Sequence, residues 1–226
     1  MFRDRKDAGE QLAEVLNTYK GRNPLVLAIP RGGVAVGYQV AEHLQSDFSI
    51  IVVRKLPLPY NPEAGFGAIA EDGSTYFDNR AMKSLHPKTV EQIIKEQKLE
   101  IRRRIAVLRK GAPLQVMTDR TVILVDDGIA MGSTMRAAVM LCKNNKASKI
   151  IVAAPVAGTS TANEFERLVE KVVILEKPLF FHAVAQVYEY WYDMSDEEVI
   201  HILQKAENYP PAVKTDDEQD IRKVKC

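Results

Sequence analysis

The feature that most constrains the fold is a series of short apolar runs that alternate with segments of helical periodicity. None of the runs approaches the length of a membrane span, and most are continuously apolar rather than alternating apolar with polar residues. Such runs predict strands buried on both faces, as in a parallel sheet covered by helices. We therefore predict an α/β fold with a five-stranded, mostly parallel sheet flanked by helices, its strands at 24–30, 48–55, 121–126, 149–154 and 172–175.

Helical segments fill the connections between these strands. Near the amino terminus Ala8, Leu12 and Leu16 recur at helical spacing. Ser195 and Glu198 form a capping-box pattern that predicts the start of the last helix. The remaining helices of the sheet region are predicted at 33–44, 133–144 and 160–170.

A long insertion, about residues 56–120, interrupts the alternation. Its first part, 56–79, is rich in Pro, Gly and Asn and is long for a plain connection, which is typical of a functional lid that can include a hairpin. Its second part is strongly helical from Pro87 to Lys110, with seven basic and three acidic residues within 91–110. This charge favours a solvated helix face, and a phosphate-facing role for part of it is the alternative.

The bulk properties fit one soluble domain. A chain of 226 residues, 46% of them hydrophobic, suits a single domain over 1–210, followed by a polar tail over 211–226. The net charge of +1 gives no overall field that argues for nucleic acid or a membrane as partner. Cys142 and Cys226 make no disulfide framework, which fits a reducing compartment.

The first residues, MFRDRKDAGEQ, are charged from the third position onward and do not resemble a signal peptide. Together with the cysteine usage, this predicts a cytoplasmic protein.

Two adjacent carboxylates mark the end of the strand at 121–126. Asp126 and Asp127 lead into a loop of small residues, 128–134, which ends where the next helix begins. Glycine lets the backbone approach a ligand closely, and a helix N-terminus offers unpaired N–H groups to an anion. Ser133 and Thr134 can cap the helix, but capping does not explain the two acids. The stretch predicts a ligand with both hydroxyl groups and a phosphate, or a metal ion.

A second turn of this kind spans residues 28–37. Arg31, Gly32 and Gly33 lie between a predicted strand and a predicted helix, and two glycines beside an arginine favour a bound anion. A Walker A loop needs Lys and Ser/Thr after its last glycine, and neither turn has that arrangement. The Rossmann pattern G-x-G-x-x-G is absent from both turns.

At these two turns the sequence resembles the type I phosphoribosyltransferases. VILVDDGIAMGST is similar to their signature for 5-phosphoribosyl-1-pyrophosphate (PRPP), and IPRGG is similar to their pyrophosphate loop. The resemblance covers about 22–200 and is greatest to a bacterial and archaeal group whose base substrate is not assigned. It implies a core of the type I phosphoribosyltransferase kind, a long flexible-loop and helical insertion, and a small hood.

By this resemblance, Asp126 and Asp127 bind the ribose hydroxyls of PRPP. They also hold Mg²⁺, the implied cofactor, indirectly through PRPP or water. The resemblance further implies that one loop cradles the 5′-phosphate: Gly128, Ile129, Ala130, Met131, Gly132, Ser133 and Thr134. The family usually has Thr at the position of Met131 and often Gly at that of Ser133, so this chain lacks one hydroxyl donor.

The same resemblance implies that Pro30, Arg31, Gly32 and Gly33 hold pyrophosphate, with a non-prolyl cis peptide among them. The insertion lies where the family has a loop that closes over the reaction. Arg54 and Lys55, at its start, are candidates for pyrophosphate contact or, alternatively, a snorkelling pair at a strand end. The resemblance thus assigns the catalytic roles to Arg31, Lys55, Asp126 and Asp127.

The implied reaction is transfer of the phosphoribosyl group from PRPP to a nitrogen acceptor, a nucleobase by analogy, with release of pyrophosphate. Phe180 and Phe181 lie where relatives stack a base, although both can equally belong to the core. Trp191 and Tyr192 can line the hood or pack beneath it. We expect a homodimer that binds PRPP and a small acceptor, and neither nucleic acid nor a membrane.

Two other functions remain open from the sequence. A non-catalytic PRPP sensor would use the same fold to report nucleotide status. A receiver-like or phosphatase-like site would use Asp126 or Asp127 as its nucleophile. Consumption of PRPP with a nitrogen acceptor distinguishes the transferase from both.

Overall fold

The computed structural model describes residues 1–207 and contains the predicted parallel sheet. Its five strands pair in the order β2-β1-β6-β7-β8, and every pairing is parallel. The fold-class prediction is thus confirmed. The strands are β1 (Leu25–Ala28), β2 (Asp47–Ile50), β6 (Thr121–Val125), β7 (Lys149–Val156) and β8 (Lys171–Glu176).

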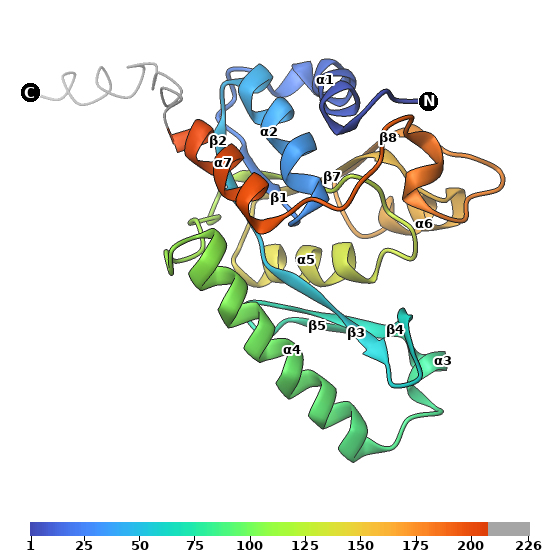
Figure 1. The fold of residues 1–226 in the computed structure, drawn as a ribbon. Coiled ribbons are helices and arrows are strands. Elements are labelled where there is room, and N and C mark those ends of the chain that lie inside the picture. The colour runs from blue at the N-terminus through green and yellow to red at the C-terminus, as the bar shows by residue number, and fades with distance from the viewer. Residues whose placement is uncertain (208–226) are drawn as a thin grey trace, which may run out of the picture.

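Helices cover both faces of this sheet (Figure 1). On one face, α1 (Arg5–Val15) and α2 (Gly32–Leu44) pack against each other and bury an apolar layer with the strands. On the other face, α5 (Ser133–Asn144) and the short α6 (Thr159–Phe165) do the same. Helix α6 ends five residues before the predicted 170, and turns complete the connection to β8.

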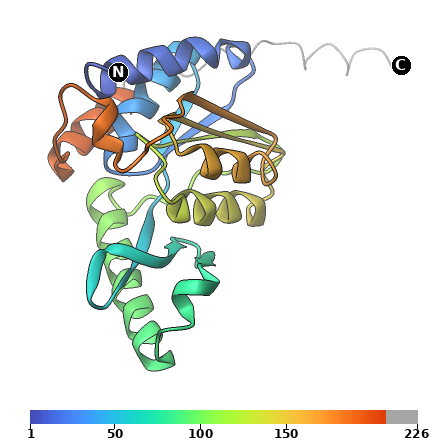
Figure 2. The ribbon, with the colours of Figure 1, turned by 90° about the vertical axis from the view of Figure 1, so that its right-hand side faces the viewer.

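The insertion forms a second sheet rather than a plain loop. Strands β3 (Val53–Leu58), β4 (Asn61–Ala70) and β5 (Thr75–Phe77) pair antiparallel in sequence order. This sheet packs against α5, so α5 lies between the two sheets, as Figure 2 shows. The helices α3 (Asn79–Met82) and α4 (Pro87–Leu108) follow, and α4 packs along the small sheet.

The predicted strand 48–55 is corrected to two strands in different sheets. β2 ends at Ile50, and β3 begins at Val53, so Arg54 and Lys55 lie within the antiparallel sheet. A buried ion pair holds the joint: Arg109 donates to both carboxylate oxygens of Glu71 and to the carbonyl of Ile50. Glu71 also accepts a 2.9 Å hydrogen bond from the amide of Val52.

The segment between β8 and the last helix, α7 (Asp196–Glu207), forms a small hood, which we define as residues 177–195. It includes the 3₁₀-helix η2 (Val184–Val187); the other 3₁₀-helix, η1 (Asn17–Tyr19), follows α1. The amino-terminal segment joins the hood, because the Phe2 amide donates to the Val187 carbonyl at 2.7 Å.

The capping box at α7 is confirmed. Ser195 and Glu198 exchange hydrogen bonds of 2.8 and 3.2 Å. Over residues 1–207, the helices are too short or too polar to cross a bilayer. The tail predicted at 211–226 lies outside the described residues.

Candidate active site

The two turns singled out in the sequence meet at the carboxyl edge of the parallel sheet. β1 and β6 are neighbours, so the turns that follow them lie side by side. A Cβ atom added to Gly32 would lie 1.7 Å from Oδ2 of Asp127, and one added to Gly33 would lie 2.9 Å from Cα of Asp126. The backbone of one turn therefore rests directly on the acids of the other, and only glycine permits this approach.

The loop 128–134 is fixed from outside by hydrogen bonds to its carbonyl groups. Arg136 donates to the carbonyl of Met131 at 2.7 Å, and Thr161 donates to that of Ala130 at 3.0 Å. Within residues 1–207, the amides of Met131, Gly132 and Ser133 donate to no protein acceptor. These amides and the N-terminus of α5 are thus available to an anion.

Gly132 and Met131 differ in what they contribute to this loop. Gly132 has φ of +75°, and a Cβ there would lie 2.8 Å from Nη1 of Arg136, so both conformation and space require glycine. Met131 is 63% exposed, and its side chain offers no hydroxyl to a phosphate. The polar groups that this loop offers to a ligand are therefore its backbone amides and the hydroxyls of Ser133 and Thr134.

The paired acids carry an electrostatic conflict. Burial and the neighbouring Asp127 carboxylate raise the pKa of Asp126 well above its usual range. Burial also raises the pKa of Asp127, although the guanidinium of Arg5 opposes that rise. The amide of Asp127 donates to Oδ1 of Asp126 at 2.9 Å and orients it. A hydroxyl donor or a cation at this position would stabilise the ionised pair.

Arg5 is the direct partner of Asp127. Its Nε donates to Oδ2 of Asp127 at 2.8 Å, and the two side chains are only 7% and 14% exposed. Its Nη1 donates to the carbonyl of Tyr192 at 2.8 Å, and its guanidinium carbon lies 3.9 Å from the centre of the Trp191 ring. The hydroxyl of Tyr188 donates to the Asp127 carbonyl at 2.7 Å. Hood residues thus contact Asp127 both directly, through Tyr188, and indirectly, through Arg5.

The 30–33 turn contains the expected non-prolyl cis peptide, between Pro30 and Arg31. The side chain of Arg31 is 37% exposed and lies 3.7 Å from Asp196 of α7. Arg54 donates to the side chain of Gln97 on α4 at 3.1 Å. Lys55 follows in β3, where its aliphatic part packs beside Gly65. The structure thus associates Arg31 and Arg54 with α7 and α4 respectively.

The two candidate base platforms differ in burial. Phe180 is 80% exposed, whereas Phe181 is half-buried and packs against the apolar cluster formed by the hood and the amino-terminal segment. In the same cluster, Val184 lies over Gly128, where an added Cβ would approach it to 2.4 Å. Trp191 is part of the hood and packs there against the ring of Tyr188.

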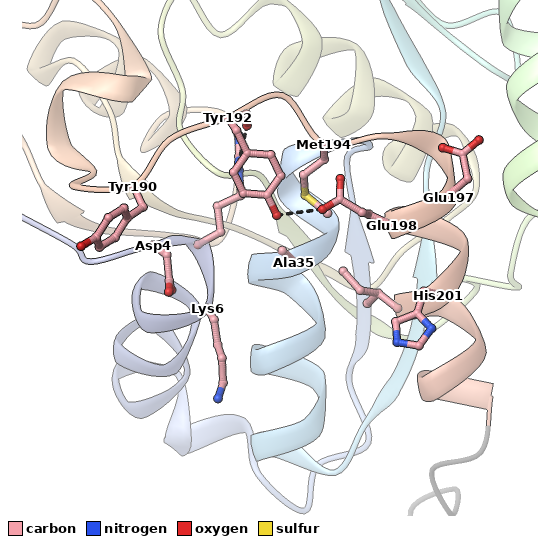
Figure 3. A pocket seen from close by; sticks show the side chains of 11 residues that line it. Asp4, Lys6, Ala35, Tyr190, Tyr192, Met194, Glu197, Glu198 and His201 are labelled. Carbon is pink, nitrogen blue, oxygen red and sulfur yellow. Dashed lines mark hydrogen bonds between the residues drawn. The ribbon is translucent and has the colours of Figure 1, made fainter.

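A cavity of about 600 Å³ lies between α1, α2, the hood and α7 (Figure 3). Tyr190, Tyr192, Met194 and Ala35 form much of its wall, and the Tyr192 hydroxyl donates to Glu198 at 2.9 Å. Arg5 lines this cavity and pairs with Asp127, which does not line it. The cavity is therefore separate from the acids and adjoins them through one side chain.

The acids alone do not make a metal cage. Among residues 1–207, no group of three or more His, Cys, Asp or Glu side chains is arranged to hold a metal ion. Mg²⁺ in proteins commonly keeps several waters and uses one or two carboxylates together with substrate phosphates. Asp126 and Asp127 fit that indirect mode.

Sequence reasoning missed Arg5. The residue lies on the buried face of α1, three and seven positions before the core residues Ala8 and Leu12. A basic residue on an apolar helical stripe is the signal that could have revealed it, because charged side chains are rarely buried unless they are paired.

Comparisons with known proteins agree with this geometry. The model of the phosphoribosyl transferase domain matches residues 4–190. Two Mycobacterium tuberculosis proteins, from strains H37Rv and CDC 1551, are each named "putative phosphoribosyl transferase" and are 37% identical over 208 residues. That match covers 91% of this chain but 47% of each relative, so the chain spans about half their length.

A solved structure is also similar over nearly the whole chain. The crystal structure of TT1426 from Thermus thermophilus aligns with a TM-score of 0.76 and 34% identity, and the match covers 91% of this chain and 98% of that one. The family match extends over most of the chain and includes both turns and both acids. This chain therefore belongs to the phosphoribosyl transferase domain family.

Proposed function

We propose that the protein transfers the 5-phosphoribosyl group from PRPP to a nitrogen acceptor and releases pyrophosphate. The observation that supports this most is the contact between the turns, in which Gly32 and Gly33 rest on Asp127 and Asp126. This contact brings Arg31, the carboxylates of Asp126 and Asp127, and the loop 128–134 to one edge of the sheet. PRPP has pyrophosphate, ribose hydroxyls and a 5′-phosphate in the same succession.

In this proposal each part of PRPP has its own binding group. The amides of 130–134 and the N-terminus of α5 bind the 5′-phosphate. Asp126 and Asp127 accept hydrogen bonds from the ribose hydroxyls, and Arg31 with the 30–33 loop binds the pyrophosphate. The C1–oxygen bond then breaks, its electron pair leaves with pyrophosphate, and the acceptor nitrogen bonds to C1 and releases its proton to solvent.

Catalysis would rest on positioning and on stabilising the charge of the leaving group. Mg²⁺, when held through water or substrate by Asp126 and Asp127, would neutralise part of the negative charge of the leaving pyrophosphate. Lys55 is the proposed second cation beside the leaving group. No covalent intermediate on the protein is needed.

The acceptor is proposed to be a nucleobase that stacks on Phe180 or Phe181. Of the two, Phe180 offers the more accessible ring, and Phe181 lies nearer the apolar cluster that contacts Gly128. The proposal also includes a cytoplasmic homodimer.

A screen for PRPP consumption tests the proposal. PRPP, Mg²⁺ and a panel of purine and pyrimidine bases are incubated with the protein, and release of pyrophosphate is measured. We expect one base to support turnover in wild type and not in Asp126→Asn or Asp127→Asn. Tight PRPP binding without turnover on any base would instead favour the sensor. Absence of PRPP binding would reject both.

A further inference from the structure

Asp196 links the pyrophosphate loop to the helix of the insertion. It is the first residue of α7, and its two carboxylate oxygens face two different arginines. Oδ1 lies 3.7 Å from Nη1 of Arg31, whereas Oδ2 accepts a 3.2 Å hydrogen bond from Nη1 of Arg103 on α4. One carboxylate thus connects a catalytic loop with an element of the insertion.

One face of α4 continues this connection. Glu100 accepts hydrogen bonds from Arg103 at 2.8 Å and from Arg104 at 2.9 Å. One turn earlier, Gln97 accepts a hydrogen bond from Arg54 of β3. Positions 97, 100 and 104 share a helix face, so this face carries the partners of three arginines. We call Arg31, Arg54, Arg103 and Arg104, with Glu100 and Asp196, the arginine network.

The arginine network carries more positive than negative charge. Four arginines meet two carboxylates, which leaves a net charge of +2 in a chain whose total is +1. Burial and the neighbouring charges of Arg104, Arg31 and Arg103 lower the pKa of Arg54, so the arginines repel one another. An anion with several charges would relieve this repulsion.

Asp196 is held loosely on the side of Arg31. Its Oδ1 is buried and accepts no hydrogen bond from the described residues, and 3.7 Å is too long for a hydrogen bond from Arg31. Arg31 and Arg103 are 37% and 49% exposed, so both can turn to a ligand in solvent. Asp196 therefore faces Arg31 without a hydrogen bond, whereas Arg103 is hydrogen-bonded to both Asp196 and Glu100.

We propose that Arg54, Arg103 and Arg104 extend the pyrophosphate loop into a single polyphosphate site. Asp196 is the internal counter-ion that pairs with Arg31 and Arg103 until the pyrophosphate group of PRPP replaces it. This inference rests on the proposed function and adds to it that the α4 insertion binds the leaving group. Asp196 is a positioning residue that competes with the ligand.

Titration calorimetry with inorganic pyrophosphate, PRPP and ribose 5-phosphate tests the arginine part. Arg103→Ala removes a half-exposed side chain, and Arg102→Ala is the matched control because Arg102 is its exposed neighbour outside the network. We expect Arg103→Ala to weaken the binding of pyrophosphate and of PRPP about five- to tenfold. Ribose 5-phosphate should bind unchanged, and Arg102→Ala should change no affinity by more than about twofold.

Asp196→Asn tests the competition, because a merely structural role would not strengthen binding. The variant keeps the shape but loses the charge, so pyrophosphate and PRPP should bind about three- to tenfold more tightly. Thermal unfolding confirms that each variant is folded. Equal effects of Arg103→Ala and Arg102→Ala, or unimproved binding in Asp196→Asn, would overturn the inference.

The ligands also separate two sources of polyphosphate. If Arg103→Ala weakens the binding of inorganic pyrophosphate but not of PRPP, the network binds a free polyphosphate and the inference as stated is wrong. If wild type binds PRPP while the variants show no effect, the inference fails and the proposed function stands. If wild type binds neither PRPP nor pyrophosphate, the proposed function itself fails.

Discussion

The guanidinium of Arg5 donates to the carboxylate of Asp127 at 2.8 Å across 122 positions of sequence. Both side chains are almost fully buried, and Trp191 stacks on the guanidinium. An ion pair in such a place is costly to break from one side, because the remaining charge stays buried without its partner.

Replacing Arg5 with Met should therefore destabilise the fold by roughly 3–5 kcal/mol. Arg3→Met is the control, because Arg3 is 59% exposed and pairs only weakly. The double variant Arg5→Met with Asp127→Asn should recover much of the loss, since no uncompensated charge remains. Urea unfolding of wild type, Arg5→Met, Asp127→Asn and the double variant measures the coupling, and strictly additive losses would contradict a buried pair.

Replacing Asp126 with Asn should raise the melting temperature at neutral pH by a few degrees. The pKa of Asp126 is raised in the folded protein, so the folded state of wild type binds the proton more tightly than the unfolded chain. The stability that protonated Asp126 contributes to wild type is present below the ordinary Asp pKa. It is lost as the pH rises through the raised pKa of the folded state. Asn does not titrate, so the advantage of the variant should shrink toward pH 4. Melting curves between pH 4 and 8 test this, and an advantage that grows on acidification would refute it.

Replacing Asp127 with Asn should weaken the binding of PRPP and of ribose 5-phosphate about ten- to a hundredfold. The reason is the loss of a charge-assisted hydrogen bond, worth roughly 1.5–3 kcal/mol. Inorganic pyrophosphate makes no ribose contact and should be affected less. Calorimetry with the three ligands checks the pattern; unchanged PRPP affinity in a folded variant would remove the ribose role from Asp127 and reopen the receiver-like function.

Replacing Gly32 with Ala should impair PRPP binding by about tenfold or more, because the new methyl group would overlap the Asp127 carboxylate. Gly158→Ala is the matched control, since a Cβ there makes only an ordinary contact at 3.5 Å with Phe181. Calorimetry and thermal unfolding of both variants separate a local displacement from general destabilisation. Similar PRPP affinity in the two variants would argue against the close approach of the turns.

Local patterns were sufficient to predict the parallel sheet and its site loops. Continuous apolar runs such as 122–125 indicate burial on both faces, which is a property of each strand alone. Helix 133–144 was placed to the residue, because Gly132 and Ser133 mark its start and the apolar periodicity its length. Parallel strands bring their carboxyl ends to one edge of a sheet, and the structure adds that β1 and β6 are neighbours, so the two turns meet there.

The change of sheet after Ile50 could not be predicted from the run 48–55. Residues 50–53, which span the joint, are all apolar and buried, and they alternate between two core clusters that each include strands of both sheets, so the apolar pattern does not mark where one sheet ends. What fixes the joint is the pair of Glu71 and Arg109, which comes from two distant segments. The roles of Arg5 and Asp196 were hidden for the same reason, since each depends on a partner far away in sequence.

The placement of the amino terminus against the hood has a consequence for how the protein acquires its site during synthesis. The Phe2 amide donates to the Val187 carbonyl, and Arg5 donates to Asp127 and to the Tyr192 carbonyl. These contacts of the amino-terminal segment are therefore complete only after more than 180 further residues have been synthesised. Contacts of such sequence separation form slowly, because a long loop must close before they stabilise anything. A nascent chain can thus build much of its sheet while Asp127 still lacks its guanidinium, and the acids would reach their final charge environment only when the hood has emerged from the ribosome.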